Sequence, residues 1–230
     1  MAAAKHYHVE PQIGDGIYLV SDVAKILNLD YDKVRRWIVG YWDGSLQENT
    51  SYVFGEKKNR AINFYSLIEF YTFFNLREQG YSVPYLKKIH KELSIKLDTK
   101  YPFAMAQEFF REKKGSRYRM RFAFVRLVEG MLKLDGKGQL SFDFLYEFLN
   151  RIEFDDNNLA AKFFPLHDTK NVVVDPKHQF GQPTINGTNI KTQTIYSLHK
   201  GGETNENICI LYNLPIDKVQ DAISFHENAA

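Results

Sequence analysis

The sequence predicts a mainly helical protein with a smaller β component, an α+β fold. Three observations predict it. Apolar residues recur at helical spacing in several separate segments, short alternating runs indicate strands, and clusters of Gly, Pro and Asn stand between them. With 230 residues, of which 44% are hydrophobic, the chain is long enough to bury one large core or several small ones.

Composition limits the classes of function. The formal net charge of +2 is too small to indicate a nucleic-acid partner by itself, so a basic surface has to come from local clustering. Cys209 is the single cysteine, which excludes an intrachain disulfide and a cysteine zinc site and fits a reducing cytoplasm. No stretch reaches the ~20 apolar residues that span a bilayer. We therefore expect a cytoplasmic protein.

The segment "IYLVSDVAKILNLDYDKVRRWIVGYW", residues 17–42, has the clearest helical periodicity. Ser21 is expected to cap a first helix that ends near Leu27. The stretch "NLD" then breaks the pattern before a second helix. Its apolar face comprises Val34, Trp37, Ile38 and Tyr41. Two short helices joined by a tight turn predict a helix-turn-helix.

The second helix is expected to present a cationic face. At 100° per residue, Lys33 and Arg36 lie opposite the stripe of Val34 and Ile38, and Arg35 lies on its flank. Two interpretations stay open: a solvated face, as is common for Lys and Arg on helices, or a surface that contacts DNA.

A β-hairpin follows this helix pair. The stretch "TSYVFGEKKNRAINF" predicts two short strands, 51–54 and 61–64, joined by a basic tip at 55–60. A hairpin in this position would form a wing.

Two longer helices come next. The first is expected from about Ser66 to Gln79, with Gly80 as its stop signal. The second begins after Ser82 and carries the apolar residues Leu86, Ile89 and Leu93.

The order of these elements resembles the winged-helix domain of MerR-type regulators over residues 17–93. The matching stretches are "VSDVAKILNL", "VRRW", "RAINFYS" and "LREQGYSVPYLKKI". In that family the second helix enters the major groove and the wing touches the flanking backbone. The resemblance implies that DNA is bound by Lys33, Arg35, Arg36, Lys57, Lys58 and Arg60. The family's long dimerising coiled coil is replaced here by "SIKLDTKYPFAM".

The sequence of the middle segment, 94–170, predicts a small α+β region that could act as a linker, in dimerisation or in docking of a partner protein. A hairpin turning at 113–116 puts Arg117, Arg119 and Arg121 on one face of its second strand. This row is either a solvent-facing edge or a docking site for an acidic partner.

A helix capped by Ser141 is expected after this hairpin. Its inward residues would be Phe144, Leu145, Phe148, Leu149 and Ile152. Asp155 and Asp156 follow at a turn into the strand-like "AAKFFPL". Because Asp and Asn side chains bond their own backbone at turns, we interpret this pair as turn chemistry and not as a catalytic site.

The last segment, 171–228, predicts a small three-helix bundle. Helices are expected at 192–199, 205–212 and 216–225. Their inward residues would be Ile195, Leu198, Ile208, Leu211, Val219, Ala222 and Ile223. The preceding "FGQPTINGTNI" is rich in turn-forming residues, which would fold an extended arm back on the helices with Gly187 at positive φ.

This segment resembles the family called domain of unknown function 433 over about 174–225. The residues that carry the resemblance are "DP" at 175–176, "FGQPTINGTNI", and "GGETNENICILYNLPIDKVQDAISF". Asn189 stands where the family usually has Arg.

A MerR-like head joined to this tail resembles the larger antitoxins of VapBC-type toxin–antitoxin pairs. The resemblance implies an antitoxin that binds and silences a PIN-like ribonuclease toxin and represses their shared operon by binding operator double-stranded DNA, as a homodimer. The alternative is a stand-alone dimeric winged-helix transcriptional regulator. Neither a catalytic site, a cofactor nor a metal site is expected, because no phosphate-binding loop or metal-ligand spacing occurs.

Overall fold

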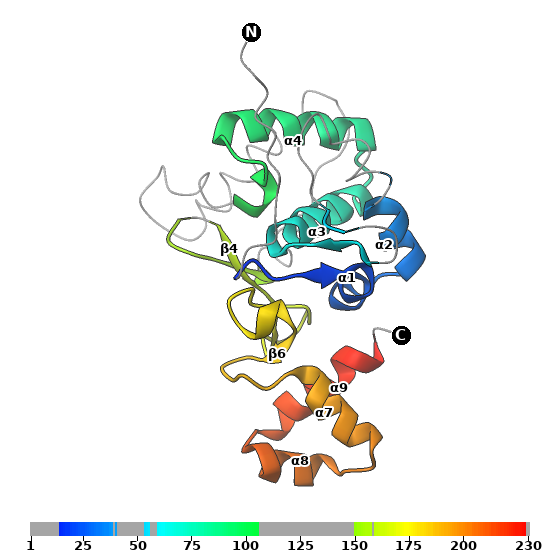
Figure 1. Ribbon diagram of the computed structural model, residues 1–230, viewed down its shortest axis with the longest axis vertical. Coiled ribbons are helices and arrows are strands. Elements are labelled where there is room, and N and C mark those ends of the chain that lie inside the picture. Colours follow the sequence, from blue (N-terminus) through cyan, green and yellow to red (C-terminus); the bar gives the residue numbers. More distant parts are fainter. Residues whose placement is uncertain are drawn as a thin grey trace. The chain divides into compact units, whose positions relative to one another are not determined.

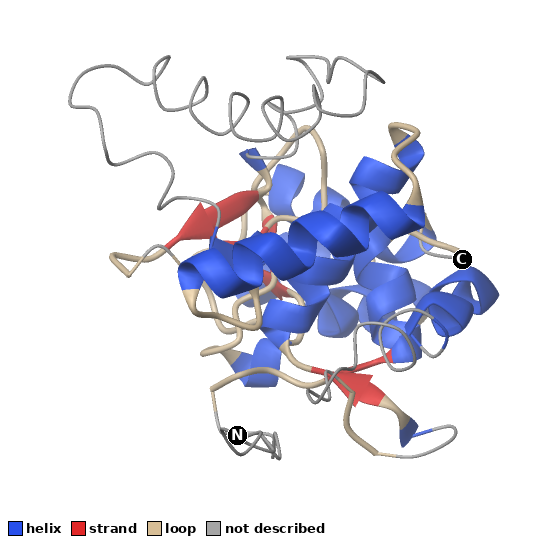
Figure 2. Ribbon diagram, turned by 90° about the horizontal axis from the view of Figure 1, so that it is seen from above, coloured by secondary structure: helices blue, strands red, loops and turns tan. Residues whose placement is uncertain are grey.

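The computed structural model describes residues 14–38, 40, 53–55, 59–105, 150–157 and 159–228. Helices make up most of these residues and the strands are short, as Figure 2 shows. The predicted α+β fold class is therefore confirmed. In the described part of the chain, no helix is both long enough and apolar enough to cross a membrane.

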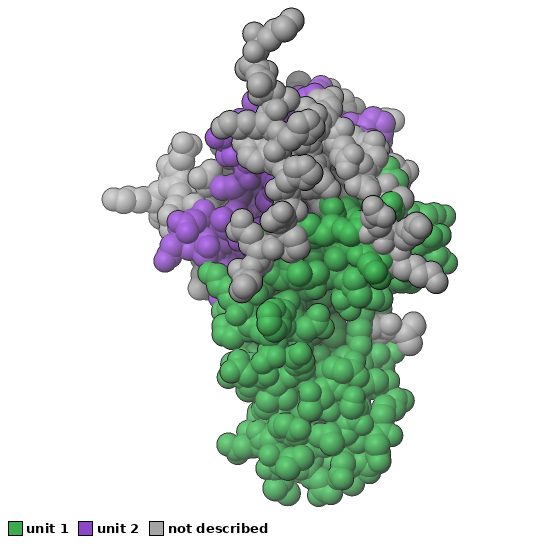
Figure 3. All heavy atoms as spheres, in the orientation of Figure 1, with its two compact units in different colours: residues 1–64, 162–230 green, residues 65–161 purple. Residues whose placement is uncertain are grey.

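Contacts divide the chain into two compact units, coloured separately in Figure 3. One unit combines residues 1–64 with 162–230, and the other comprises 65–161. The sequence analysis defined three segments by their motifs, 17–93, 94–170 and 171–228, whereas the two units are defined by contacts. Those boundaries stay a prediction.

The first unit begins with a strand, two helices and a second strand: β1 (Tyr18–Leu19), α1 (Val20–Leu27), α2 (Tyr31–Trp37) and β2 (Ala61–Ile62). Strands β1 and β2 pair antiparallel, with Tyr18 opposite Ile62 and Leu19 opposite Ala61. The helices run where the periodicity predicted them (Figure 1). Strand β1 was not expected, since two residues are too few for an alternating pattern.

The start of α1 differs from the prediction. The helix begins at Val20, so Ser21 lies inside its first turn and is not the cap. Leu19 occupies the cap position, and its backbone N–H donates to the Asp22 carboxylate at 2.9 Å. The pairing of β1 ends the extended chain at Leu19, and the helix starts two residues earlier than the serine indicated.

The carboxyl-terminal part of this unit consists of an arm and three helices. The arm contains β5 (Val172–Val173), the short 3₁₀ helix η6 (Gln179–Gly181) and β6 (Thr184–Ile185), and β5 pairs antiparallel with β6. The helices are α7 (Thr192–Lys200), α8 (Asn205–Tyr212) and α9 (Ile216–Glu227). The arm folds back on them as predicted, since Lys218 donates to the Asn186 carbonyl at 2.8 Å and Asn171 donates to the Asp221 carboxylate at 2.9 Å.

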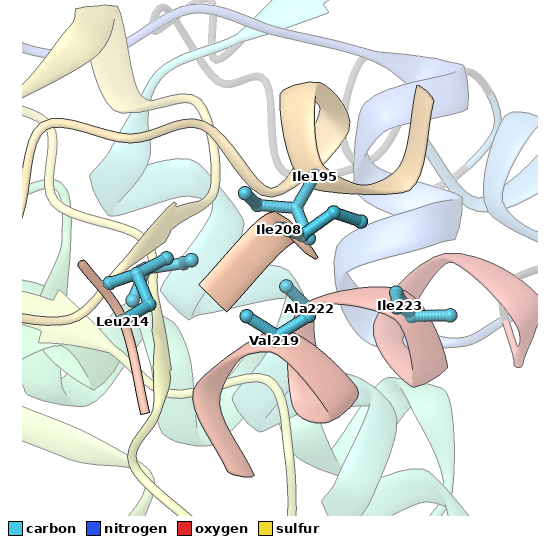
Figure 4. Packing of buried hydrophobic residues seen from close by; sticks show 7 residues of the cluster. Ile195, Ile208, Leu214, Val219, Ala222 and Ile223 are labelled. Atoms are coloured by element: carbon cyan, nitrogen blue, oxygen red, sulfur yellow. The ribbon is translucent and has the colours of Figure 1, made fainter. Parts of the chain in front are cut away.

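One small apolar cluster holds the three helices together. Figure 4 shows most of its side chains gathered between α7, α8 and α9. The cluster comprises Ile185, Ile195, Ile208, Leu214, Val219, Ala222 and Ile223, with Leu198, Cys209 and Tyr212 packed against it.

Leu211 was predicted inward, and that prediction is wrong. Its side chain is 67% exposed. The inner face of α8 is centred on Ile208, Cys209 and Tyr212, and Leu211 lies about 100° of helix rotation away from that centre. The spacing of apolar residues in α8 fits an inner face that includes Leu211 as well as the observed one, and the packing against α7 and α9 determines which is buried.

The second unit contains two long helices, α3 (Phe64–Glu78) and α4 (Val83–Leu97), and the short 3₁₀ helix η3 (Pro102–Met105). Glu69 on α3 is fully buried. Its carboxylate accepts the backbone N–H groups of Phe103 and Ala104, at 2.6 and 3.1 Å, and lies 2.8 Å from His90 on α4. A buried carboxylate needs such partners, and this one joins α3, α4 and η3.

Two expectations for the long helices are refined. Phe64 begins α3 and is not the end of a strand, so the predicted strand 61–64 is shorter, as β2. Leu86, Ile89 and Leu93 are buried as predicted.

The strands β3 (Ile152–Phe154) and β4 (Ala160–Phe163) form a hairpin. Ile152 was expected on the helix that Ser141 begins, and it lies instead in β3. The turn prediction is confirmed, since the Asp155 carboxylate accepts the backbone N–H groups of Asn157 and Leu159 at 2.9 and 3.0 Å. The remaining expectations for 106–149 lie outside the described residues.

Two glycines of the arm have the same backbone conformation and different surroundings. Gly181 and Gly187 both have φ = +82°, which confirms the prediction for Gly187. A Cβ added at Gly181 would overlap the hydroxyl of Tyr18, whereas the nearest atom at Gly187 is the Lys218 Nζ, 4.0 Å away. Tyr18 is fully buried. Gly181 is therefore needed for both its conformation and its lack of a side chain.

We predict that Gly187→Ala lowers the free energy of unfolding by about 1 kcal/mol, because an L side chain is strained at positive φ. Gly181→Ala should lower it by about 1–3 kcal/mol more, because the added methyl group overpacks against Tyr18. Urea unfolding of both variants measures the difference. Equal losses would contradict the close approach of Tyr18 to Gly181.

Candidate nucleic-acid interface

The turn between α1 and α2 is built from side-chain and backbone caps. Asn28 ends α1 in the left-handed conformation, with φ = 52°, and Leu29 donates its N–H to the Ala24 carbonyl at 2.9 Å. Asp30 begins α2, and its carboxylate accepts the N–H of Lys33 at 2.8 Å. The two caps leave only three residues between the helices, so their relative direction is fixed locally.

Burial then decides which face of α2 looks outward. Val34 is fully buried and Ile38 is 2% exposed. Arg35 and Arg36 are exposed, and Lys33 is half-buried. The predicted outward face is therefore observed for Arg35 and Arg36, whereas Lys33 is only partly exposed.

The contacts of the two arginines with the described part of the chain are exposed and local. The Nε of Arg35 lies 3.7 Å from the Asp32 carboxylate, and the Arg35 side chain is 60% exposed. Arg36 donates from its Nε to the Asp32 carbonyl at 3.3 Å. Exposed pairs of this kind contribute about 0–1 kcal/mol, so a phosphate or base could replace them at small cost.

Part of the predicted wing is described. Phe54 and Ala61 pair through two backbone hydrogen bonds, of 2.7 and 3.0 Å, so the chain does form an antiparallel hairpin around the tip. Arg60 is half-buried at its base. The other predicted cations lie outside the described residues: Lys57, Lys58, Arg117, Arg119 and Arg121.

A small cavity of about 120 Å³ lies in the same unit, between α1, the arm and the start of α7. Its polar lining includes Asp22, Lys25, Gln182, Lys191, Thr192, Gln193 and His226. Lys25 donates to the Gln193 side chain at 3.3 Å across 168 positions of sequence. Sequence patterns could not have indicated this site, because its residues come from distant segments.

Burial and charge shift two pKa values at this cavity. Burial lowers the pKa of Lys25, and the nearby Asp22 carboxylate partly opposes the shift. Burial and the charge of Lys25 lower the pKa of His226 to about 4. The His226 Nε2 lies 2.9 Å from the Thr192 hydroxyl, and its ring stacks on Tyr196 with the ring centres 4.8 Å apart. His226 is therefore a neutral packing residue at pH 7.

Within the described ranges, no cluster of three or more His, Cys, Asp or Glu residues could hold a metal ion. That the chain is not an enzyme stays a prediction.

Comparison with known families identifies the tail. Residues 172–226 match the model described as "Protein of unknown function (DUF433)". The carboxyl terminus is a DUF433 domain. It comprises the arm from β5 onward and nearly all of the three helices, as the resemblance predicted.

Two proteins of Mycobacterium tuberculosis (strain ATCC 25618 / H37Rv) are similar in sequence. "Putative antitoxin VapB45" is 29% identical over 99 residues, which are 42% of this chain and 41% of that protein. The match thus spans about two fifths of that relative's length. "Uncharacterized protein Rv2308" is 23% identical over 221 residues, covering 91% of this chain and 89% of that protein.

A solved structure has a similar fold. The crystal structure of Rv2018 from Mycobacterium tuberculosis superposes with a TM-score of 0.64 at 18% identity, covering 90% of this chain and 96% of the other. At this identity the likeness concerns the fold alone.

The lowered pKa of His226 predicts a loss of stability in mild acid. In the unfolded chain His226 takes up a proton near its ordinary pKa of 6.5, whereas in the folded chain it does so only near pH 4. Stability therefore falls as the pH drops through this window, and we expect a loss of up to about 2 kcal/mol between pH 7 and pH 5.

Urea unfolding at both pH values tests this prediction, with His226→Gln as the comparison. The variant should be less stable at pH 7, because it loses the stacked ring, but should lose less stability on acidification than the native chain. If acidification lowered the free energy of unfolding equally in the two proteins, His226 would not be neutral and buried in the folded chain.

Proposed function

We propose that this protein is an antitoxin that binds a protein toxin and represses the operon encoding both. The proposed DNA binding rests on one observation: α2 has an exposed cationic face, on the side of the helix away from the buried residues Val34 and Ile38. The DUF433 tail and the 29% identity to a protein named as a VapB45 antitoxin support the other half.

On this proposal α2 lies in the major groove. Its exposed arginines have weak local partners, and a guanidinium can donate two hydrogen bonds to the O6 and N7 of guanine. Lys33 would contribute from the half-buried edge of the same helix. The wing cations Lys57, Lys58 and Arg60 would contact phosphates beside the groove.

A homodimer fits this mode of binding. One helix-turn-helix covers only a half-site, and a two-fold dimer can place two of them one helical turn of DNA apart. We therefore propose that the operator has two-fold symmetry.

The proposed toxin is a PIN-like ribonuclease encoded beside the antitoxin. The row of Arg117, Arg119 and Arg121 stays a candidate for contact with the acidic active site of such a nuclease. The test is co-expression: the neighbouring gene product should arrest growth when expressed alone and be neutralised when this chain is present. A neighbour that is harmless alone and does not bind this chain would favour the stand-alone regulator instead.

We predict that Arg36→Ala lowers the affinity for operator DNA by about 1–3 kcal/mol and alters sequence preference, as expected for a side chain that reads a base edge. The Arg35/Arg36 double alanine variant should lose more. Each phosphate contact that is removed should also reduce the slope of log K against log salt by about 0.9. Gel-shift titrations at several salt concentrations measure both effects.

Lys200→Ala is the matched control, because it removes an exposed cation from α7 and leaves α2 intact. It should bind the operator like the native chain. If the double arginine variant also binds unchanged, α2 does not lie in the groove.

A further inference from the structure

The tail domain exposes three large aliphatic side chains close together in the sequence. Ile210 and Leu211 on α8 are 81% and 67% exposed, and Ile216 at the start of α9 is 43% exposed. We call these three residues the α8 patch. They lie on either side of a tight turn, in which Asn213 has φ = 51° and Leu214 turns inward to the core.

The packing of α8 explains why the patch cannot turn inward. Ile208 is 1% exposed and lies in the core of the tail, and Cys209 and Tyr212 pack beside it. Rotating α8 to bury Leu211 would withdraw these residues from the cluster. The exposure of Ile210 and Leu211 therefore follows from the fold of the domain, and large aliphatic side chains exposed near one another can mark an interaction site.

Carboxylates flank the patch in the sequence. Glu206 lies one turn before Ile210 on the same side of α8, Glu203 lies two residues before this helix begins, and Asp217 follows Ile216 directly. Residues 192–228 contain five carboxylates, two lysines and no arginine. One of those lysines, Lys218, is already bonded to the Asn186 carbonyl. An acidic surface repels DNA phosphates, so this face is unsuited to nucleic acid.

The charge also argues against a second copy of this chain on the patch. In a two-fold dimer each patch would face its own image, which would bring Glu203, Glu206 and Asp217 close to the same carboxylates of the other subunit. Like charges at an interface cost several kcal/mol, whereas a surface carrying Lys and Arg would be attracted.

We propose that the α8 patch is the docking surface for a protein partner whose apolar contact area is rimmed by Lys and Arg. On the function proposed above, on which this inference rests, that partner is the neighbouring toxin. The aliphatic side chains supply the buried centre of the interface, and the carboxylates supply orientation and a faster association rate.

The experiment measures binding of the purified neighbouring gene product to the full chain by surface plasmon resonance. Ile210→Ser with Leu211→Ser should weaken binding at least tenfold, mainly through faster dissociation. Glu203→Lys with Glu206→Lys should slow association and reduce its dependence on salt. Ile95→Ser is the matched control, because Ile95 on α4 is 74% exposed and lies outside the patch, so it should bind like the native chain.

Thermal unfolding and operator gel shifts of each variant establish that the chain is folded. Native-like binding by the double serine variant would overturn the α8 patch as the docking surface and leave the antitoxin function standing. Absence of binding by the native chain would overturn the proposed function and this inference with it. Conversion of a native dimer to a monomer by the serine substitutions would identify a second copy as the occupant and overturn the proposal.

Discussion

Helices α2 and α8 each bury a single stripe of side chains, and this packing governs the surfaces that the two helices present. The seven residues of α2 are anchored by Val34, and the eight residues of α8 by Ile208. Each of these two helices buries a stripe on one side, and the opposite row of side chains is left exposed. Whatever the sequence places opposite the anchor must face outward.

The two helices use that outward face differently. On α2 it carries cations, of which Arg35 and Arg36 make weak, local contacts with Asp32. On α8 it carries the aliphatic residues Ile210 and Leu211 together with Glu206. The same architecture of two helices and a capped turn therefore supports opposite surface chemistries, one suited to phosphates and the other to a basic protein.

Close backbone contacts hold the irregular parts of the chain in place. The arm before α7 is held by its own turns and by the pairing of β5 with β6, and the side chains of Lys218 and Asp221 on α9 bond it to the helices. Gly181 meets the buried ring of Tyr18, which brings β1 and the arm together within one unit. Turn-forming residues in the arm thus serve tertiary packing as well as local direction.

The sequence by itself determined the positions of most helices, the side-chain caps of α2 and α8, and the buried stripe of α2. Local rules sufficed there, since Asp30, Thr204 and the Asp155 turn make the hydrogen bonds that their residue types favour. Tertiary structure decided the start of α1, the strand at Ile152, the exposure of Leu211 and the cavity between Lys25 and Gln193. Each of these depends on contacts between distant segments, and a helical period of 3.6 residues leaves several rotations open until such contacts select one.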